Sequence, residues 1–325
     1  MTAQSVTDVS VVIPTRNGGP RLLQVFDALL RQKTGLRHDV IVIDSGSQDG
    51  SEQAARARGF RTLSIDPGDF NHGETRDRAI AASRAPAVAL LVQDAVPADE
   101  RWLDRLAAPL LEDDEAAGSF SRQVPIPGGN PILEQRLRNW IAGQEVARRA
   151  RLEPPESWES LSPIERLNLV AFDNVAACIK RSCWIQHPFG RRPFGEDIAW
   201  ATWAIRSGHV IRFHPDSIVE HSHDRSAWHE ARRIYSDHRN LNLLLGLVTV
   251  PDLKTARRGR EAALSHYLEV LEKAPLVETE RDRRRAWARA YSWGEALAQW
   301  LAPKVNQARG NLLLDWIDRR LRRGI

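Results

Sequence analysis

The stretch VIVIDSGSQDGS, residues 40–51, combines a short strand, a polar turn and the start of a helix. Residues 40–43 are all apolar and β-branched, which is typical of a strand buried on both faces of a parallel sheet. Asp44 and Ser45 follow directly, before a helix predicted over residues 50–59. Ligands of such sheets bind where the strands end, so this turn is a candidate site.

The same alternation of strand and helix extends through the first hundred residues. Apolar runs predict strands, and leucines or alanines at helical spacing predict helices between them. Strands are predicted over residues 9–13, 40–43, 61–65 and 87–92, and helices over residues 22–30, 50–59 and 73–84. This order predicts an α/β fold with a mostly parallel central sheet that helices cover on both faces.

The later part of the chain is less regular. A helix is predicted over residues 133–153, and an amphipathic helix over residues 195–208. Residues 210–223 predict two short strands around a Pro-Asp turn. From residue 227 onward the pattern is helical and basic.

Charge divides the chain unevenly. Residues 226–325 carry 19 Lys/Arg and 12 Asp/Glu, whereas the first 225 residues carry 27 and 30. We therefore expect an N-terminal domain over residues 1–225 and a basic helical region over residues 226–325. The basic region suits a membrane surface, a lid or an oligomer contact. Its Trp residues lie at core-like helical spacing, so nucleic-acid binding, which needs stacking aromatics on a basic face, is not expected.

The sequence also limits where the protein is expected to be located and what its two cysteines can do. No run of about 18 uncharged apolar residues occurs, and the N-terminus lacks the pattern of a signal peptide. Cys178 and Cys183 have no second pair to complete a zinc site. We therefore expect a cytoplasmic protein with reduced, structural thiols.

Several polar side chains lie where strands end or helices begin. Asp44 either accepts a hydrogen bond from a base or ribose or stabilises its own turn. Arg76, near a helix start, either contacts a phosphate or is a solvated surface side chain. Asp94 follows the strand over residues 87–92, and it either caps a helix or holds a divalent cation with substrate phosphates.

Two further groups come from the second half of the domain. Glu196 and Asp197 open a helix, where acids favour the macrodipole, but one of them could equally serve as a general base. His221 and His223 alternate along a predicted strand, so only one of them is expected to reach a given site. With Asp94, an imidazole would complete a metal site.

Other chemistries lack their motifs. The sequence contains no G-x-x-x-x-G-K-[ST] phosphate loop, no G-x-G-x-x-G after the first strand and no G-x-S-x-G nucleophile elbow. A nucleotidyltransferase, which also uses nucleotides on an α/β sheet, and a non-catalytic scaffold of the same fold both stay open.

Five stretches together resemble family 2 glycosyltransferases of the GT-A fold. They occur in that family's order, and the resemblance covers about residues 8–225. The longer stretches FNHGETRDRA and SRQVP resemble a bacterial rhamnosyltransferase subgroup that uses dTDP-rhamnose to build surface polysaccharides. The five stretches are VSVVIPTRNGG, VIVIDSGSQDGS, QDAVPAD, GEDIAWATWAIRSG and VEHSH.

The resemblance implies a role for each matching residue. The nucleotide and substrate pocket would comprise Pro14, Thr15, Asn17, Asp44, Ser45, Arg76, Gln93 and Glu196. Ser45 departs from relatives that carry a second acid there. Asp94, with His221 or else His223, would hold Mg²⁺ or Mn²⁺, and Asp197 would be the general base.

The resemblance also implies the reaction. A sugar, rhamnose from dTDP-rhamnose, would pass with inversion to a hydroxyl of a glycan or lipid-linked acceptor. A UDP- or GDP-sugar is the alternative donor. Because the acceptor would be lipid-linked, the basic C-terminal region is expected to bind the inner face of the membrane, or else to form a lid or a homo-oligomer.

Overall fold

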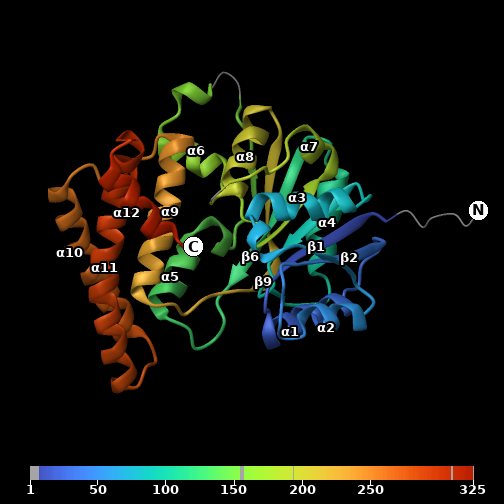
Figure 1. Cartoon of the computed structure of the whole chain (residues 1–325), viewed down its shortest axis with the longest axis horizontal. Helices are drawn as coiled ribbons and strands as arrows, with labels where there is room; N and C mark the ends of the chain where they lie inside the picture. The colour runs from blue at the N-terminus through green and yellow to red at the C-terminus, as the bar shows by residue number, and fades with distance from the viewer. Residues whose placement is uncertain (1–6, 154–156, 193, 309, 325) are drawn as a thin grey trace, which may run out of the picture. The chain divides into compact units, whose positions relative to one another are not determined.

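The computed structural model describes residues 7–153, 157–192, 194–308 and 310–324. Within these residues nine strands form one sheet (Figure 1). The strands are β1 (Val9–Thr15), β2 (His38–Asp44), β3 (Arg61–Ser64), β4 (Ala87–Leu91), β5 (Val96–Pro97), β6 (Ala116–Val124), β7 (Arg148–Ala150), β8 (Ala176–Lys180) and β9 (Val210–Glu220).

The order of strands in the sheet brings distant parts of the chain together. The order is β3-β2-β1-β4-β8-β6-β9-β5, and β7 pairs with β9 outside this path. Strands β1 to β4 are parallel, as predicted, whereas β8 runs antiparallel to both β4 and β6, and β6 is parallel to β9. The carboxyl ends of β1, β2, β4, β6 and β9 therefore share one edge with the amino end of β8.

Helices cover both faces of this sheet. The helices in this part of the chain are α1 (Gly19–Leu30), α2 (Ser51–Ala57), α3 (His72–Ala82), α4 (Trp102–Glu112), α7 (Arg181–Gln186) and α8 (Glu196–Arg206). The apolar sides of α1 and α4, with Phe26 and Trp102, pack on one face, together with Val11, Val42 and Cys178 from the strands. Burial of this continuous apolar surface is the main term that stabilises the sheet.

An aromatic group packs against the opposite face. The ring of Phe172 lies 5.8 Å from that of Phe120 on β6 and 5.4 Å from that of Trp200 on α8. Gly118 lies beneath them, and a β-carbon there would come within 3.2 Å of both Phe172 and Trp200. These contacts fix the position of α8, whose first two residues are Glu196 and Asp197.

The helix predicted over residues 133–153 is wrong in its second half. Helix α5 (Pro131–Asn139) ends early, and a 3-10 turn, η2 (Ile141–Gly143), follows. Gly143 packs so closely that an added β-carbon would lie 2.0 Å from the carbonyl oxygen of Leu137. Residues 148–150 then pair with β9 as an edge strand, because the sheet offers them partners that a short polar helix would lack.

The two short strands predicted over residues 210–223 are instead one strand, β9, that ends at Glu220. Its pairing with β6 shifts register between Ser121 and Arg122, opposite His214 and Ile218. The Pro-Asp pair therefore forms an irregularity within the strand and does not end it. His221 and His223 lie beyond the strand, so the alternation of side chains that separated them does not apply.

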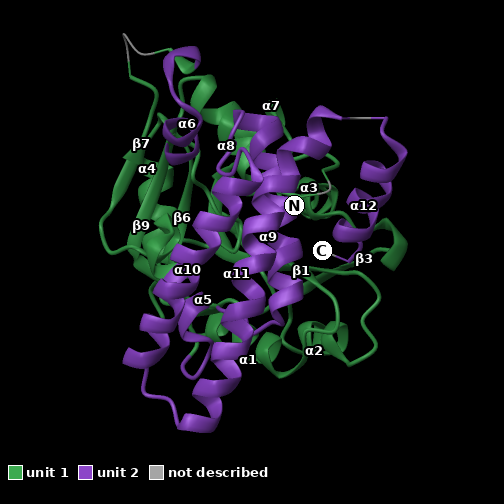
Figure 2. Cartoon of the chain, turned by 90° about the vertical axis from the view of Figure 1, so that its left-hand side faces the viewer, with its two compact units in different colours: residues 1–126, 137–158, 169–221 green, residues 127–136, 159–168, 222–325 purple. Residues whose placement is uncertain are grey.

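The chain divides into two compact units, coloured separately in Figure 2. The first comprises residues 1–126, 137–158 and 169–221 and contains the sheet. The second contains the predicted helical C-terminal region. Its helices are α6 (Pro163–Leu169), α9 (Ala227–Leu245), α10 (Leu253–Lys273), α11 (Glu278–Gln307) and α12 (Leu312–Arg322). Of two further 3-10 turns, η1 (Pro67–Asp69) belongs to the first unit, and η3 (Trp158–Ser160) spans a boundary between the residue ranges of the two units.

The helices of the second unit pack through a core of their own. Tyr235 on α9 and Tyr291 on α11 are fully buried within it. The hydroxyl of Tyr235 donates to Asp318 of α12 at 2.8 Å, and Arg239 pairs with the same carboxylate at 2.9 Å. Among the described residues, no helix is both long enough and apolar enough to cross a bilayer.

Candidate active site

Most predicted site residues lie at the shared edge of the sheet. Thr15 and Asp44 end β1 and β2, Asp94 follows β4, and His221 follows β9. Because β8 runs the opposite way, the segment before it reaches the same edge. The strand topology thus explains how residues more than a hundred positions apart meet.

The loops after β1 and β2 hold each other. Asn17 has a left-handed backbone, φ 48°, a conformation that asparagine tolerates better than most residues. Its backbone N–H donates to Ser47 Oγ at 2.8 Å, and its side-chain oxygen accepts from the backbone N–H of Gln48 at 2.8 Å. Asn17 therefore fixes the shape of the turn where the nucleotide was predicted to bind.

The buried residues predicted for the nucleotide pocket have structural partners. Asp44 accepts hydrogen bonds from the backbone N–H groups of Gly46 and Ser47, at 2.9 and 2.8 Å. Ser45 Oγ donates to the carbonyl oxygen of Thr15 at 3.1 Å. Pro14 lies within β1, opposite Ile43.

Gln93 connects the loop after β4 to the loop after β1. Its Oε1 accepts from the backbone N–H of Arg16 at 2.9 Å, and its Nε2 donates to the carbonyl oxygen of the same residue at 3.3 Å. The neighbouring Asp94 is bonded through its backbone oxygen to Arg21 Nε at 3.2 Å. A neutral amide at position 93 can both donate and accept, which a carboxylate could not do.

Asp94 lies beside the histidines that follow β9. His221 Nε2 is 3.7 Å from Asp94 Oδ1. Asp94, His221 and His223 each offer one ligand atom, and in the described part of the chain these atoms lie within 4.8 Å of one another. Each of the three side chains is partly buried, so an ion there would remain reachable from solvent.

Gln123 and Asp173 extend this group away from Asp94. Gln123, at the end of β6, is 4% exposed. Its Oε1 lies 3.0 Å from His221 Nδ1, and its Nε2 donates to Asp173 Oδ2 at 2.7 Å. A continuous hydrogen-bonded series therefore leads from the histidine beside Asp94 to the segment before β8.

Arg76 and Glu196 form a buried ion pair between α3 and α8. Arg76 Nη1 is 3.1 Å from Glu196 Oε1, and it also donates to the carbonyl oxygen of His72 at 2.9 Å. The alternative that Arg76 is a solvated surface residue is therefore wrong. Burial opposes ionisation of Glu196, but Arg76 and then His72 favour it, and the pKa of Glu196 is lowered overall.

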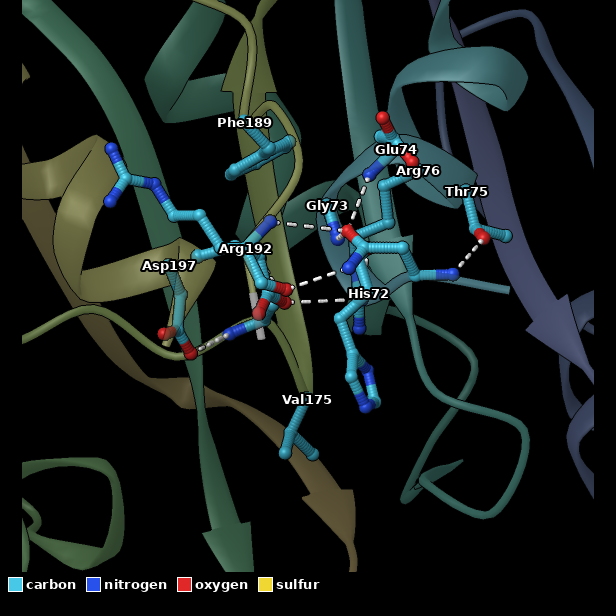
Figure 3. A network of polar contacts seen from close by, with 12 residues as sticks. His72, Gly73, Glu74, Thr75, Arg76, Val175, Phe189, Arg192 and Asp197 are labelled. Carbon is cyan, nitrogen blue, oxygen red and sulfur yellow. Dashed lines mark hydrogen bonds and ion pairs between the residues drawn. The ribbon is translucent and has the colours of Figure 1, made fainter. Parts of the chain in front are cut away.

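The pKa of Asp197, which follows Glu196 in the chain and is labelled in Figure 3, is shifted in the opposite direction. The two oxygens of Asp197 accept from the backbone N–H groups of Ile198 at 2.8 Å and Asn174 at 3.4 Å. Burial, followed by the charges of Glu196 and Asp173, raises the pKa of Asp197 well above its ordinary value. Two adjacent carboxyl groups with pKa values moved apart are typical of a site that separates structural and acid–base roles.

The loop that leads into α8 is held by α3. Asn71, the N-cap of α3, donates through Nδ2 to the carbonyl oxygen of Arg192 at 2.8 Å. Asp77 accepts from the backbone N–H groups of Phe189 and Gly190. An added β-carbon on Gly73 would lie 2.0 Å from the carbonyl oxygen of Gly190, so only glycine fits. This close contact positions Asp197 from the N-terminal side of its helix.

The sequence motifs did not identify Gln123, Asp173 and Asn174. Gln123 lies in the SRQVP stretch, but nothing local distinguishes it from any other polar residue of a strand. Its partners are 50 and 98 positions away. The available signal was the FDN stretch, residues 172–174, a polar pair directly before an apolar strand.

Comparison with known proteins identifies the family of the chain. Residues 10–180, more than half of the chain, match glycosyl transferase family 2. The O-antigen chain rhamnosyltransferase RfbN of Salmonella typhimurium is 30% identical over 234 residues, 70% of either protein. The O-antigen chain rhamnosyltransferase WbaN of Salmonella anatum is 27% identical over 233 residues, again 70% of either protein.

A solved structure shares the fold. Glucosyl-3-phosphoglycerate synthase from Mycobacterium tuberculosis, in complex with Mn²⁺, UDP-glucose and phosphoglyceric acid, aligns with a TM-score of 0.50 and 20% identity. The alignment covers 76% of this chain and 81% of that one. With the matched family and the topology of the sheet, the chain belongs to glycosyl transferase family 2 and is a glycosyltransferase of the GT-A fold.

Proposed function

We propose that the protein transfers rhamnose from dTDP-rhamnose to a hydroxyl of a glycan or lipid-linked acceptor in surface polysaccharide synthesis. The supporting observation is that two O-antigen chain rhamnosyltransferases match the chain over 70% of its length. Family membership decides against a nucleotidyltransferase. Residues 1–225 would carry the chemistry.

Asp197 would be the general base. Its raised pKa makes the carboxylate a stronger proton acceptor than an ordinary aspartate, which general-base catalysis near neutral pH requires. The acceptor hydroxyl would lose its proton to Asp197 as its oxygen attacks the anomeric carbon. The bond between that carbon and the diphosphate oxygen breaks at the same time, so the configuration inverts.

Glu196 and Arg76 would support Asp197. Because Arg76 is already paired with Glu196 and only 5% exposed, we assign it to holding α8 and no longer to the diphosphate that it was expected to contact. Glu196 stays ionised, and its charge favours the protonated form of its neighbour. This pair would therefore tune the base.

The donor set beside β4 fits a divalent cation. One carboxylate, Asp94, and the imidazoles of His221 and His223 present ligand atoms close together, and such ions take further oxygens from a diphosphate. Bound Mg²⁺ or Mn²⁺ would neutralise charge on the leaving diphosphate. The solved relative with Mn²⁺ and UDP-glucose supports a metal of this kind.

The nucleotide would lie along the loops after β1 and β2. Asn17 is exposed there, whereas Pro14, Thr15, Asp44 and Ser45 form the wall beneath it. Gln93 would hold the loop after β1 in the position that donor binding requires.

The experiment that tests this function is a donor screen. The protein is incubated with Mg²⁺ or Mn²⁺ and with dTDP-rhamnose, UDP-glucose or GDP-mannose, and release of the nucleoside diphosphate is measured. We expect turnover of dTDP-rhamnose that EDTA abolishes. Turnover confined to a UDP- or GDP-sugar would reject rhamnose and favour the alternative donor.

The proposed location is the inner face of the cell membrane, reached through α12. Leu312, Leu313 and Trp316 on this helix are 84%, 65% and 57% exposed, and the exposed Arg319 and Arg320 follow on the same side one turn later. An exposed apolar patch followed by arginines suits an anionic lipid surface.

A flotation assay with vesicles containing phosphatidylglycerol tests this location. We expect Trp316→Ala to reduce the bound fraction several-fold, whereas Trp228→Ala, which removes an equally exposed Trp from α9, should leave it unchanged. If the wild type, Trp316→Ala and Trp228→Ala bound the vesicles equally, Trp316 on α12 would have no role in membrane binding. A change in molar mass by light scattering would instead assign the patch to a homo-oligomer.

A further inference from the structure

The side chain of Gln123 is held by partners that distinguish its two ends. A carboxylate can only accept hydrogen bonds, so Asp173 must face the amide nitrogen of Gln123, at 2.7 Å. The amide oxygen then faces His221 Nδ1, at 3.0 Å. A rotated amide would place two oxygen acceptors against each other, and burial of Gln123 leaves little water to relieve that repulsion.

The orientation of the amide determines the tautomer of the imidazole. The oxygen of Gln123 can only accept, so Nδ1 of a neutral His221 must carry the proton. Nε2 is then left with its lone pair. This is the nitrogen that lies 3.7 Å from Asp94 Oδ1.

We propose that Gln123, oriented by Asp173, is a positioning residue that holds His221 in the Nδ1–H tautomer and so presents Nε2 to the cation. The inference rests on the proposed metal site. Partners of a metal-binding histidine's second nitrogen commonly fix its ring and tautomer, and losing them typically lowers metal affinity by about 10–100-fold.

The topology makes this arrangement specific to the sheet. Gln123 ends β6, His221 follows β9, and Asp173 precedes β8, and β6 lies between the other two strands. Pairing of these strands brings the three residues to the same edge of the sheet. Asp173 also acts on Asp197 through its charge, so one carboxylate influences both the metal side and the base side.

The first test needs neither metal nor substrate. Long-range ¹H–¹⁵N spectra of the ¹⁵N-histidine-labelled protein at pH 8 report which ring nitrogen carries the proton, with His221 assigned by its loss in His221→Asn. We expect the Nδ1–H pattern in the wild type and a shift toward Nε2–H in Gln123→Met, a variant of similar volume whose thioether is only a weak hydrogen-bond acceptor. The Nε2–H pattern in the wild type would overturn the proposal.

The second test measures Mn²⁺ binding in the presence of dTDP, by the electron paramagnetic resonance signal of the free ion. We expect Gln123→Met to weaken binding by about 10–100-fold. Ser119→Ala, which removes a buried hydroxyl from the same strand, should bind as the wild type does. Unchanged affinity in Gln123→Met would reject the positioning role.

The two tests separate this inference from the proposed function. If the wild type bound no Mn²⁺, the metal site itself would be wrong. If the wild type bound Mn²⁺ but its His221 were protonated at Nε2, only the role of Gln123 would be wrong. Gln123→Glu provides a further check, because a carboxylate cannot donate to Asp173 and should not restore affinity.

Discussion

Arg76 on α3 and Glu196, the first residue of α8, form an ion pair of 3.1 Å whose side chains are only 5% and 8% exposed. The pair lies directly beside Asp197 and joins α3, which contacts β1 and β2, to α8, which contacts β9. Because so little water reaches it, neither charge can be removed without leaving the other uncompensated.

We predict that Glu196→Gln and Arg76→Met are each strongly destabilising. Breaking a buried ion pair from one side typically costs about 3–5 kcal/mol. Urea denaturation followed by circular dichroism measures the change. The double variant Arg76→Met/Glu196→Gln should lose less stability than the two single changes added together, and strict additivity would show that the charges do not interact.

Asp197→Asn should make the protein more stable at neutral pH. The pKa of Asp197 is raised in the folded state, so the folded protein binds its proton more tightly than the unfolded chain does. The stability contributed by this group therefore falls as pH rises from about 3.9, the ordinary value, through the raised value.

Thermal melts of the two proteins at several pH values measure this effect. We expect a higher Tm for Asp197→Asn at pH 7 to 8, by roughly 2–4 °C per kcal/mol, and no difference below about pH 4. An equal or lower Tm for the variant at pH 8 would show that the ionised carboxylate of Asp197 does not destabilise the folded protein.

The rate of transfer should depend on pH through the same group. Only the deprotonated Asp197 can accept a proton, so kcat/KM should fall as pH drops through its raised pKa. The charge of Glu196 contributes to that raised pKa, hence Glu196→Gln should move the acid limb to lower pH. Glu100→Gln, in an exposed pair with Lys33, is the matched control and should leave the profile in place.

Strands β1, β2 and β4 were predictable because each is mostly an apolar run, whereas β3 is short and largely polar. The break after α5 was not predictable, because Gly143 ends the helical segment by a close approach to Leu137, and because β7 is stabilised by β9. Similarly, the Pro-Asp pair predicts a turn locally, but pairing with β6 keeps β9 continuous.

The site residues likewise differ in whether the local sequence could identify them. Asp94, Asp197 and His221 were identifiable as acids at strand and helix ends and as a histidine near a strand. Gln123 and Asp173 were not, because their roles arise from strand order. The buried pairing of Arg76 likewise depends on a helix 120 positions away and has no local signature.

Asp94→Asn should weaken the binding of Mn²⁺ and reduce turnover at low metal concentration. The amide retains one oxygen but loses the charge that attracts the cation. Isothermal titration with Mn²⁺ in the presence of dTDP measures the affinity, which we expect to fall at least tenfold. Asp99→Asn, which alters an acid paired with Arg105 in the same loop region, should bind normally. Normal binding in Asp94→Asn would exclude this residue as a ligand.

Removal of the acceptor's proton by Asp197 can be tested with a single variant of this residue. The turnover number of Asp197→Asn with dTDP-rhamnose is compared with that of the wild type at pH 8, alongside the Kd for dTDP. We predict that kcat falls by about 10²–10⁴-fold while the Kd changes less than threefold. A kcat near that of the wild type would show that Asp197 is not the general base.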